Sequence, residues 1–397
     1  MRLYSTSGRP VTLGEVLSES GGEGVVHRVA SQPGQVAKIY RPGQADAARR
    51  AKLAHMIANP PEDRSARRAA PSVAWPVDVL FSDPRGSALA GYVMPEVRGA
   101  LLAVALYDVA ERKRLARCFN WRHLLHTTRN LADVIDVLHR RGYVIGDLNE
   151  SNVFVHADTT VTLIDTDSFQ MVVGGRCLPC TVGKPEYTPP ESQAVTFRDH
   201  ARTRHDDTFA YGVLAFQLLM LGRHPFDGIP QRADLDSPES PGRIRSNWFA
   251  AAHLGQGKGI LPPSKCPPFR LLPPTVQSLF VRCFVDGARN PALRPAASEW
   301  RHTLSAVIRN GLAVCRSNPE HIFPNHLTAC PWCERITRER VQDPFPNPMA
   351  LQHARGRLLR TPAMPAQRQT TPARVRLWFA QFVVPRWRSL CNQLRVP

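Results

Sequence analysis

Short β-type runs separated by turn residues fill the chain up to residue 97. The runs are rich in Val, Ile, Leu and Tyr, and Gly, Pro and Ser stand between them, as expected for strands joined by tight turns. We expect strands over residues 13–17, 25–29, 35–40, 77–81 and 89–94. The segment 45–57 is rich in Ala, Arg and Leu and ends before Asn59-Pro60-Pro61, which predicts a helix. Residues 1–97 therefore predict a small lobe built on an antiparallel β-sheet.

The pattern becomes helical from residue 98 onward. Apolar residues recur every three or four positions between Leu124 and Leu138, and Gly142 follows as a helix stop. Two short β-type runs come next, at 153–155 and 161–164. Further helices are predicted over residues 208–221, 276–284 and 297–312. The sequence thus indicates an α+β protein, in which a mainly α-helical lobe over residues 98–312 follows the sheet lobe.

The composition is typical of a globular protein. Hydrophobic residues make up 43% and charged residues 21% of the 397 positions. We find no run of about 18 apolar residues that could span a bilayer. The first eight residues lack the apolar stretch of an export signal, so we expect a cytoplasmic protein whose nine cysteines stay reduced.

Positive charge is concentrated towards the C-terminal end. The formal net charge is +18, and beyond Asp343 the chain has arginines but no Asp, Glu or Lys. Residues 337–397 are rich in Pro, Arg and Gln, which predicts a basic, disordered tail. Aromatic residues among the arginines of 375–390 leave peripheral membrane contact open as an alternative. Nucleic-acid binding is a further alternative function, supported only by the positive charge and the cysteines. It predicts strongly salt-dependent DNA binding.

Two glycines and a lysine in the sheet lobe are candidates for phosphate binding. Gly22 and Gly24 lie between two predicted strands, where backbone N–H groups can approach a triphosphate; an ordinary tight hairpin is the alternative. Lys38 stands within the apolar run Val36-Ala37-Lys38-Ile39, and a lysine in such a strand needs an anionic partner or an exit to water. An exposed edge lysine is the alternative there.

The strongest chemical signal lies in the helical lobe. Asp147 and Asn152 follow a predicted helix at a spacing of five residues, and Asp165 ends the next β-type segment. Phosphoryl transfer needs one carboxylate that orients the substrate hydroxyl, and an amide plus a second carboxylate that hold Mg²⁺ against the phosphates of ATP. Each of these residues could cap a turn on its own. Together, at this spacing, they favour a phosphoryl-transfer site.

With these motifs the chain resembles bacterial members of the eukaryotic-type Ser/Thr protein kinase superfamily. The resemblance implies a protein-kinase-like two-lobed fold that uses ATP and Mg²⁺. It implies Lys38 on the α- and β-phosphates, Asp147 as the catalytic aspartate, and Asn152 with Asp165 as Mg²⁺ ligands. In its adenine site the Pro95 carbonyl would accept from the base and the Val97 N–H would donate to it. The full set of nucleotide-binding residues that the resemblance implies is Gly22, Gly24, Val29, Ala37, Lys38, Met94, Pro95, Val97, Asn152 and Asp165.

Several positions depart from the family pattern. The predicted helix offers Lys38 no glutamate, because Asp46 comes too early and Glu62 lies beyond two prolines. In the loop that contains Asp147, the catalytic loop of the family, Gly146 stands where the family pattern has an arginine. Asn149 stands where that pattern has a lysine. Loss of the arginine removes the usual receptor for an activation-segment phosphate, which predicts activity that does not depend on such phosphorylation.

Two functions of different class therefore stay open, an ATP-dependent Ser/Thr protein kinase and an ATP-binding pseudokinase scaffold. The retained lysine, aspartates and asparagine favour the first, and the missing helix glutamate favours the second. The run Gly146–Asn152 combined with Leu163–Phe169 resembles a bacterial subgroup. Members of that subgroup are often accompanied by a von Willebrand-type domain protein and a metal-dependent Ser/Thr phosphatase, which would be partners. The protein substrate does not follow from the sequence.

A dense Cys/His cluster occupies residues 313–336. Cys330 and Cys333 form a C-x-x-C knuckle, and Cys315 with His321 or His326 would complete a tetrahedral Zn²⁺ site. We expect a structural zinc site formed by Cys315, His321, Cys330 and Cys333. Inert thiols and redox chemistry are the alternatives, although the region lacks the βαβ context of redox C-x-x-C motifs.

Overall fold

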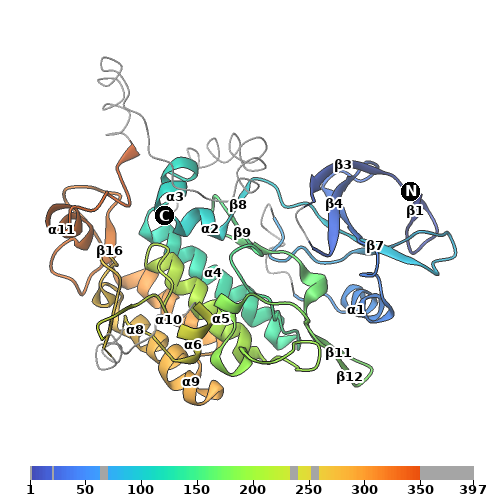
Figure 1. Cartoon of the computed structure of the whole chain (residues 1–397). Coiled ribbons are helices and arrows are strands. Elements are labelled where there is room, and N and C mark those ends of the chain that lie inside the picture. The colour runs from blue at the N-terminus through green and yellow to red at the C-terminus, as the bar shows by residue number, and fades with distance from the viewer. Residues whose placement is uncertain (1, 20–21, 63–69, 233–239, 252–258, 349–397) are drawn as a thin grey trace.

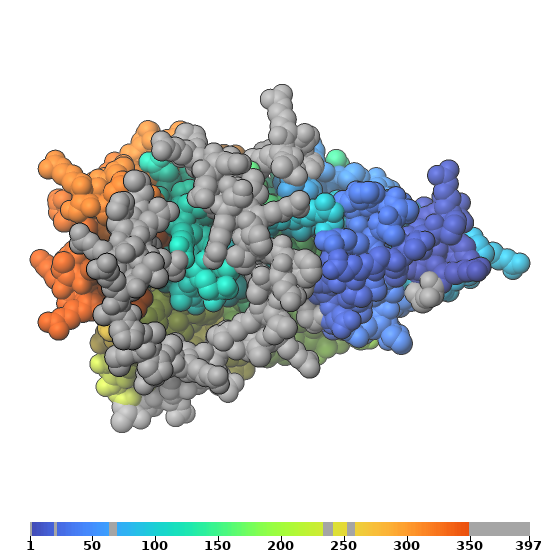
Figure 2. Space-filling model, turned by 90° about the horizontal axis from the view of Figure 1, so that it is seen from above, coloured from blue at the N-terminus to red at the C-terminus, as the bar shows by residue number. Residues whose placement is uncertain are grey.

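The structure is a computed structural model, and it describes residues 2–19, 22–62, 70–232, 240–251 and 259–348. Figure 1 shows a β-rich half, in blue, beside a larger helical half, in green to orange. Seen from above in Figure 2, the blue half and the orange C-terminal segments lie at opposite ends of the molecule. The aromatic stretch 375–390 lies outside the described residues. In the part of the chain that the structure describes, no helix is both long and apolar enough to cross a membrane.

A seven-stranded antiparallel sheet forms the β-rich half, in the order β2-β1-β6-β7-β5-β4-β3. Its strands are β1 (Leu3–Tyr4), β2 (Pro10–Val11), β3 (Leu13–Ser18), β4 (Gly24–Val29), β5 (Gln35–Tyr40), β6 (Asp78–Phe81) and β7 (Leu89–Pro95). The predicted strands are all present, and β1 and β2 were not predicted. Helix α1 (Ala47–Ala58) follows β5, and the Asp46 side chain caps it by accepting from the Arg49 N–H.

Successive side chains of a strand point to opposite faces of the sheet. Apolar side chains are buried on both faces. One face gathers an apolar cluster that joins the sheet to α1: Val36, Tyr40, Leu53, Ala74, Val79, Phe81, Tyr92 and Met94. The other face gathers Leu3, Val11, Val29, Ala37, Leu80, Ala90 and Val93. Since Lys38 is two residues from both Val36 and Tyr40, it belongs to the face that carries α1.

The helical half is built around two long helices, α4 and α5. Its N-terminal elements are β8 (Ala100–Leu102), α2 (Ala103–Tyr107), α3 (Val109–Leu115), α4 (Trp121–Arg140), β9 (Val153–His156), β10 (Val161–Leu163), β11 (Met171–Val173) and β12 (Arg176–Leu178). The later elements are α5 (Arg204–Leu219), β13 (Ile229–Pro230), α6 (Ser240–Arg245), β14 (Ile260–Leu261), α8 (Pro274–Val281), α9 (Gly287–Arg289) and α10 (Ala297–Asn310). Almost every residue of α5 is buried, as its apolar sequence predicts, and one continuous core surrounds it.

A small C-terminal module completes the described chain. It contains the hairpin β15 (Leu312–Val314) and β16 (Ile322–Pro324), then α11 (Pro331–Arg338) and the segment up to residue 348. Two predicted boundaries are corrected by it. Leu312 pairs with Pro324 and so belongs to the hairpin rather than to the preceding helix. The segment after 337 is not a solvated tail at its start, because Phe345 is buried against the core.

Candidate active site

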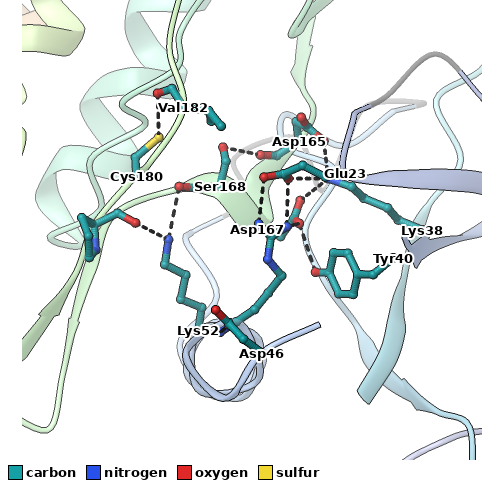
Figure 3. A network of polar contacts seen from close by, with 12 residues as sticks. Glu23, Lys38, Tyr40, Asp46, Lys52, Asp165, Asp167, Ser168, Cys180 and Val182 are labelled. Carbon is teal, nitrogen blue, oxygen red and sulfur yellow. Dashed lines mark hydrogen bonds and ion pairs between the residues drawn. The ribbon is translucent and has the colours of Figure 1, made fainter. Parts of the chain in front are cut away.

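Lys38 lies at the centre of a buried polar network in the β-rich half. It points from β5 towards α1 and is 4% exposed. Its ammonium Nζ lies 2.6 Å from Oδ1 of Asp165 and 2.8 Å from Oδ1 of Asp167 (Figure 3). Burial by itself would lower the pKa of Lys38, but the two carboxylates reverse that effect and raise it. The lysine is therefore held as a cation by acidic partners, and the exposed-edge alternative does not apply.

Asp167 is the most enclosed acid of this network. Its side chain has no exposed surface and accepts hydrogen bonds from four side chains of the β-rich half: Lys38, Tyr40, Arg49 and Tyr92. Burial would raise the pKa of Asp167, but the cations of Lys38 and Arg49 outweigh it and lower the pKa. Asp167 is thus a fully hydrogen-bonded carboxylate.

Arg49 connects this network to the turn that contains Gly22 and Gly24, which we call the glycine turn. Its guanidinium donates to both carboxylate oxygens of Glu23, at 2.8 Å each, and to Oδ2 of Asp167 at 2.9 Å. Glu23 also lies 3.6 Å from Lys38. Sequence reasoning missed Arg49, Glu23 and Asp167, because it searched α1 for an acid and α1 supplies a cation instead. The available signal was the acid two residues after Asp165 together with a basic helix.

The catalytic loop between α4 and β9 is held by side-chain hydrogen bonds. Asn149 Nδ2 lies 2.9 Å from Oδ1 of Asp147, and Asn152 Nδ2 lies 2.9 Å from the Asp147 backbone oxygen. Asp207, at the start of α5, accepts from the backbone N–H groups of Ile145 and Gly146 at 2.8 Å each. These contacts fix the loop on both sides of Asp147.

Asp147 combines partial burial with nearby charges. Burial raises its pKa, and the hydrogen bond from Asn149 with the positive charges of Arg202 and Lys184 opposes that shift. The charge of Asp165 also acts on Asp147 and raises its pKa further.

The predicted groups meet at one place between the two halves. Lys38 bonds to Asp165, and Asn152 bonds to Asp147. A backbone hydrogen bond of 3.0 Å from the Ile164 N–H to the Asn152 carbonyl joins the two pairs. An ammonium, two carboxylates and an amide thus line one site, as phosphoryl transfer requires.

Two predicted nucleotide-binding residues lie on the wrong face of the sheet. Val29 and Ala37 are buried in the cluster opposite to Lys38. The family resemblance implied Ala37, whereas the two-residue period of a strand puts Val36 on the face of Lys38. Val26 pairs directly across from Lys38 and therefore shares its face. Val26 and Val36 replace Val29 and Ala37 as residues beside the lysine.

The remaining predicted nucleotide-binding positions lie around the same sheet face. Gly24 is packed so closely on β5 that an added Cβ would come within 2.7 Å of the Ile39 carbonyl oxygen, while a Cβ on Gly22 would meet nothing within 4 Å. Met94 pairs with Val36, and Val97 packs against the cluster that contains both. Pro95 is the last residue of β7 and lies where the chain leaves the sheet.

The activation segment, residues 165–191, is fastened from several directions. Lys52 of α1 donates to the backbone oxygens of Ser168 and Pro179 (Figure 3). The buried Arg202 donates to the Val182 oxygen at 2.7 Å. Near its end, Glu191 forms an ion pair with Arg294, at 2.6 and 2.8 Å. The segment is thus ordered by groups of the protein itself.

Lys184 brings a cation to the catalytic loop. Its ammonium bonds to Oε1 of Glu150 at 2.9 Å and to the Ser151 hydroxyl. The family pattern has a lysine at the position of Asn149. In this chain the lysine that contacts the loop is Lys184, which comes from a different part of the chain. The sequence does not predict the contact between Lys184 and Glu150, because these residues come together only in the folded chain.

The four predicted metal ligands of the C-terminal module come together. The sulfur atoms of Cys315, Cys330 and Cys333 and a ring nitrogen of His321 all lie within 4.8 Å of one another. The other ring nitrogen of His321 lies 2.9 Å from Oδ1 of Asp343, an arrangement typical of metal-bound histidines. His326, the other candidate, instead contacts the Arg270 carbonyl. Three thiols and one oriented imidazole form a donor set that could hold a metal ion.

Comparison with known proteins agrees with this geometry. Residues 101–300 match the family model described as "Protein kinase domain". "Protein kinase YegI" of Escherichia coli O157:H7 is 35% identical over 332 residues, which cover 83% of this chain and 50% of that protein. The protein of the same name from Escherichia coli K12 is 34% identical over 334 residues, covering 84% of this chain and 50% of that protein. The chain thus spans about half the length of these curated relatives.

A more distant match adds support from another group of kinases. "cGMP-dependent protein kinase 2" of Rattus norvegicus is 31% identical over 101 residues, 25% of this chain and 13% of that protein. The family match covers half of the chain and contains the catalytic loop and the activation segment. From its two-lobed fold, its converging polar groups and this match, the chain belongs to the protein kinase family.

Proposed function

We propose that this chain is an ATP-dependent protein kinase that transfers the γ-phosphoryl group to a Ser or Thr hydroxyl of a protein. The observation that carries the proposal is the meeting of Lys38, Asp147, Asn152 and Asp165 in one site between the two halves. These residue types are the ones that phosphoryl transfer uses for positioning and charge stabilisation.

Each group has a role that its surroundings support. Lys38, held as a cation, binds the α- and β-phosphates. Asn152 and Asp165 offer the oxygen ligands that Mg²⁺ prefers, and the ion when bound neutralises charge on the phosphates. Asp147 orients the substrate hydroxyl and accepts its proton. The order of the catalytic loop reduces the reorganisation that reaction would otherwise require.

The pseudokinase alternative rested on the missing helix glutamate. That argument loses force, because Lys38 has two acidic partners within hydrogen-bonding distance. The scaffold function would leave ATP binding intact without transfer.

The deciding experiment is γ-phosphate transfer by the purified chain, compared with an Asp147→Asn variant. We expect labelling of protein Ser or Thr residues that the substitution abolishes. Equal labelling by both proteins would show that Asp147 does not act as proposed, and ATP binding without any labelling would support the scaffold.

We also infer that the Cys/His cluster holds a structural zinc ion. Three sulfur ligands and one nitrogen ligand suit tetrahedral Zn²⁺, and the Asp343 contact fixes the orientation of His321. Metal analysis of the purified protein should find one zinc per chain, and a Cys333→Ser variant should lose it. A full complement of zinc in that variant would refute the assignment.

The resemblance of the catalytic motifs implies two partner proteins. We infer that a von Willebrand-type domain protein and a metal-dependent Ser/Thr phosphatase act with this kinase. Co-purification of either with the chain is the corresponding test.

A further inference from the structure

The charges around Lys38 are arranged in reverse of the expected pattern. The family pattern has an acid on the small-lobe helix, whereas α1 here directs Arg49 and Lys52 towards the activation segment. The acid is Asp167, from the activation segment itself. We propose that Asp167, anchored by Arg49, is the positioning residue that aims Lys38 at the nucleotide phosphates. This inference rests on the proposed kinase function.

The two oxygens of Asp167 divide the work of anchoring and aiming. Oδ1 accepts from Lys38 at 2.8 Å and from Tyr92 at 2.9 Å. Oδ2 accepts from Arg49 at 2.9 Å and from Tyr40 at 3.0 Å. The donors come from β5, β7 and α1, so the carboxylate is fixed from three elements at once. A carboxylate fixed in this way presents one defined acceptor to the lysine.

Arg49 makes the position of Asp167 depend on the rest of the small lobe. Its guanidinium forms a two-pronged contact with Glu23 at the glycine turn and lies 4.9 Å from the centre of the Tyr40 ring. Rigid planar donors of this kind hold carboxylates with defined geometry. The glycine turn, α1 and the activation segment therefore meet through one arginine.

A purely structural role is the competing explanation, because a buried acid with four donors also ties the activation segment to the sheet. The two roles predict different kinetics. A positioning residue affects the chemical step more than ATP binding, since other contacts still bind the nucleotide. A structural residue lowers stability, ATP affinity and turnover together.

The main experiment compares Asp167→Asn with the unmodified chain, using kcat for transfer, Kd for ATP and the melting temperature. We expect kcat to fall on the order of 10²-fold, the cost of a small misplacement of a catalytic group, with a much smaller change in Kd. Asp158→Asn, which changes an exposed acid in the turn between β9 and β10, is the matched control and should leave all three values unchanged. An Asp167→Asn enzyme with unchanged kcat, or with parallel losses in all three values, would overturn the proposal.

Arg49→Gln provides a second variant if Asp167→Asn does not fold. It leaves the Lys38–Asp167 contact in place but removes the charged donor from Oδ2 of Asp167, which keeps only the hydrogen bond from Tyr40. We expect a smaller fall in kcat, again without a matching change in Kd, and an unchanged kcat would overturn the proposal.

A readout without catalysis separates this inference from the proposed function. Crystal structures of the nucleotide-free unmodified and Asp167→Asn chains compare the position of the Lys38 ammonium. Lys38 faces Glu23, Asp165 and Asp167, so loss of the Asp167 charge should displace Nζ from its place 2.6 Å from Oδ1 of Asp165. If the chain transfers no phosphate but this displacement is seen, the kinase proposal fails while Asp167 remains the partner that positions Lys38. An unchanged position of Nζ would refute the role of Asp167.

Discussion

Gly146 shows how a single position can decide which residues surround the catalytic aspartate. It precedes Asp147 and has a φ of +75°, a conformation that favours glycine. A Cβ at this position would lie 2.5 Å from the Cβ of Cys180 and 3.5 Å from Cδ of Arg202. The arginine expected here by family pattern therefore cannot fit. Arg202 enters the same space from a different part of the chain and binds the activation segment.

We predict that Gly146→Ala destabilises the protein more than Gly142→Ala does. Gly142 has a φ of +79° but nothing within 4 Å of an added Cβ, so it isolates the backbone cost. That cost is about 1–2 kcal/mol, and the overlap with Cys180 should add about 1–3 kcal/mol at position 146. Denaturant unfolding of the two variants measures the difference. Equal losses would mean that the packing around Cys180 relaxes freely.

At the residue scale, local motifs were predictable and their distant partners were not. Asp147, Asn152 and Asp165 stand in short runs whose spacing already indicates chemistry. Arg49 and Lys184 act across the fold, Arg49 on Asp167, 118 positions away, and Lys184 on Glu150, 34 positions away. Only the folded chain can reveal such pairs, because side-chain contacts between separate elements leave no periodic pattern in the sequence. The error at Ala37 was of another kind, a shift of one residue in a strand.

At the element scale, strands and helices were predictable wherever they carry a pattern of some length. Strand β5 has the predicted bounds, and the helix predicted over 45–57 appears as α1 with a small shift. Strands β1 and β2 have two residues each and exist only through pairing with each other and with β6. The helix predicted over 276–284 changes at Arg282 into a wider turn. Tertiary contacts decide these features, and the local pattern does not record them.

Helix α1 and the activation segment form one unit through Lys52. Burial lowers the pKa of Lys52, and its ammonium spans the segment between the Ser168 and Pro179 oxygens. Thr188 is buried and its hydroxyl donates to the Lys184 oxygen, whereas Thr181 is exposed. Contacts within the protein thus hold this segment in place.

We predict that activity needs Lys52 and does not need the Thr181 hydroxyl. Lys52→Met removes a charged donor from two backbone oxygens, which should cost about 1–3 kcal/mol and loosen the segment. Limited proteolysis should then cut the segment faster, and transfer should fall, while Thr181→Ala should keep full transfer. Arg50→Met, on the exposed side of α1, is the control for loss of a basic residue. Loss of transfer in Thr181→Ala would show that phosphorylation there is required.

At the scale of the whole molecule, the Cys/His module is continuous with the helical half. Trp332 of α11 is fully buried, with its ring centre 6.2 Å from that of Trp121 and 5.1 Å from that of Phe345. The buried Arg112 donates to the Pro344 oxygen, which ties α3 to the end of the module. Figure 1 shows the module at the end of the molecule opposite to the sheet. A metal ion there would act on stability, since the site of phosphoryl transfer lies in a different region.

We therefore predict that metal removal lowers the melting temperature of the whole helical half in a single transition. The module shares its core with α4, so loss of the ion should loosen both together. Each kcal/mol lost lowers the melting temperature of a domain of this size by about 2–4 °C, so a loss of several kcal/mol should give a fall of roughly 10 °C. Calorimetry with and without a chelator measures this, and a Cys330→Ser variant should reproduce the chelated protein. Cys177→Ser, which changes an exposed thiol in β12, should melt as the unmodified chain does. A separate low-temperature transition would instead show that the module unfolds independently of the kinase core.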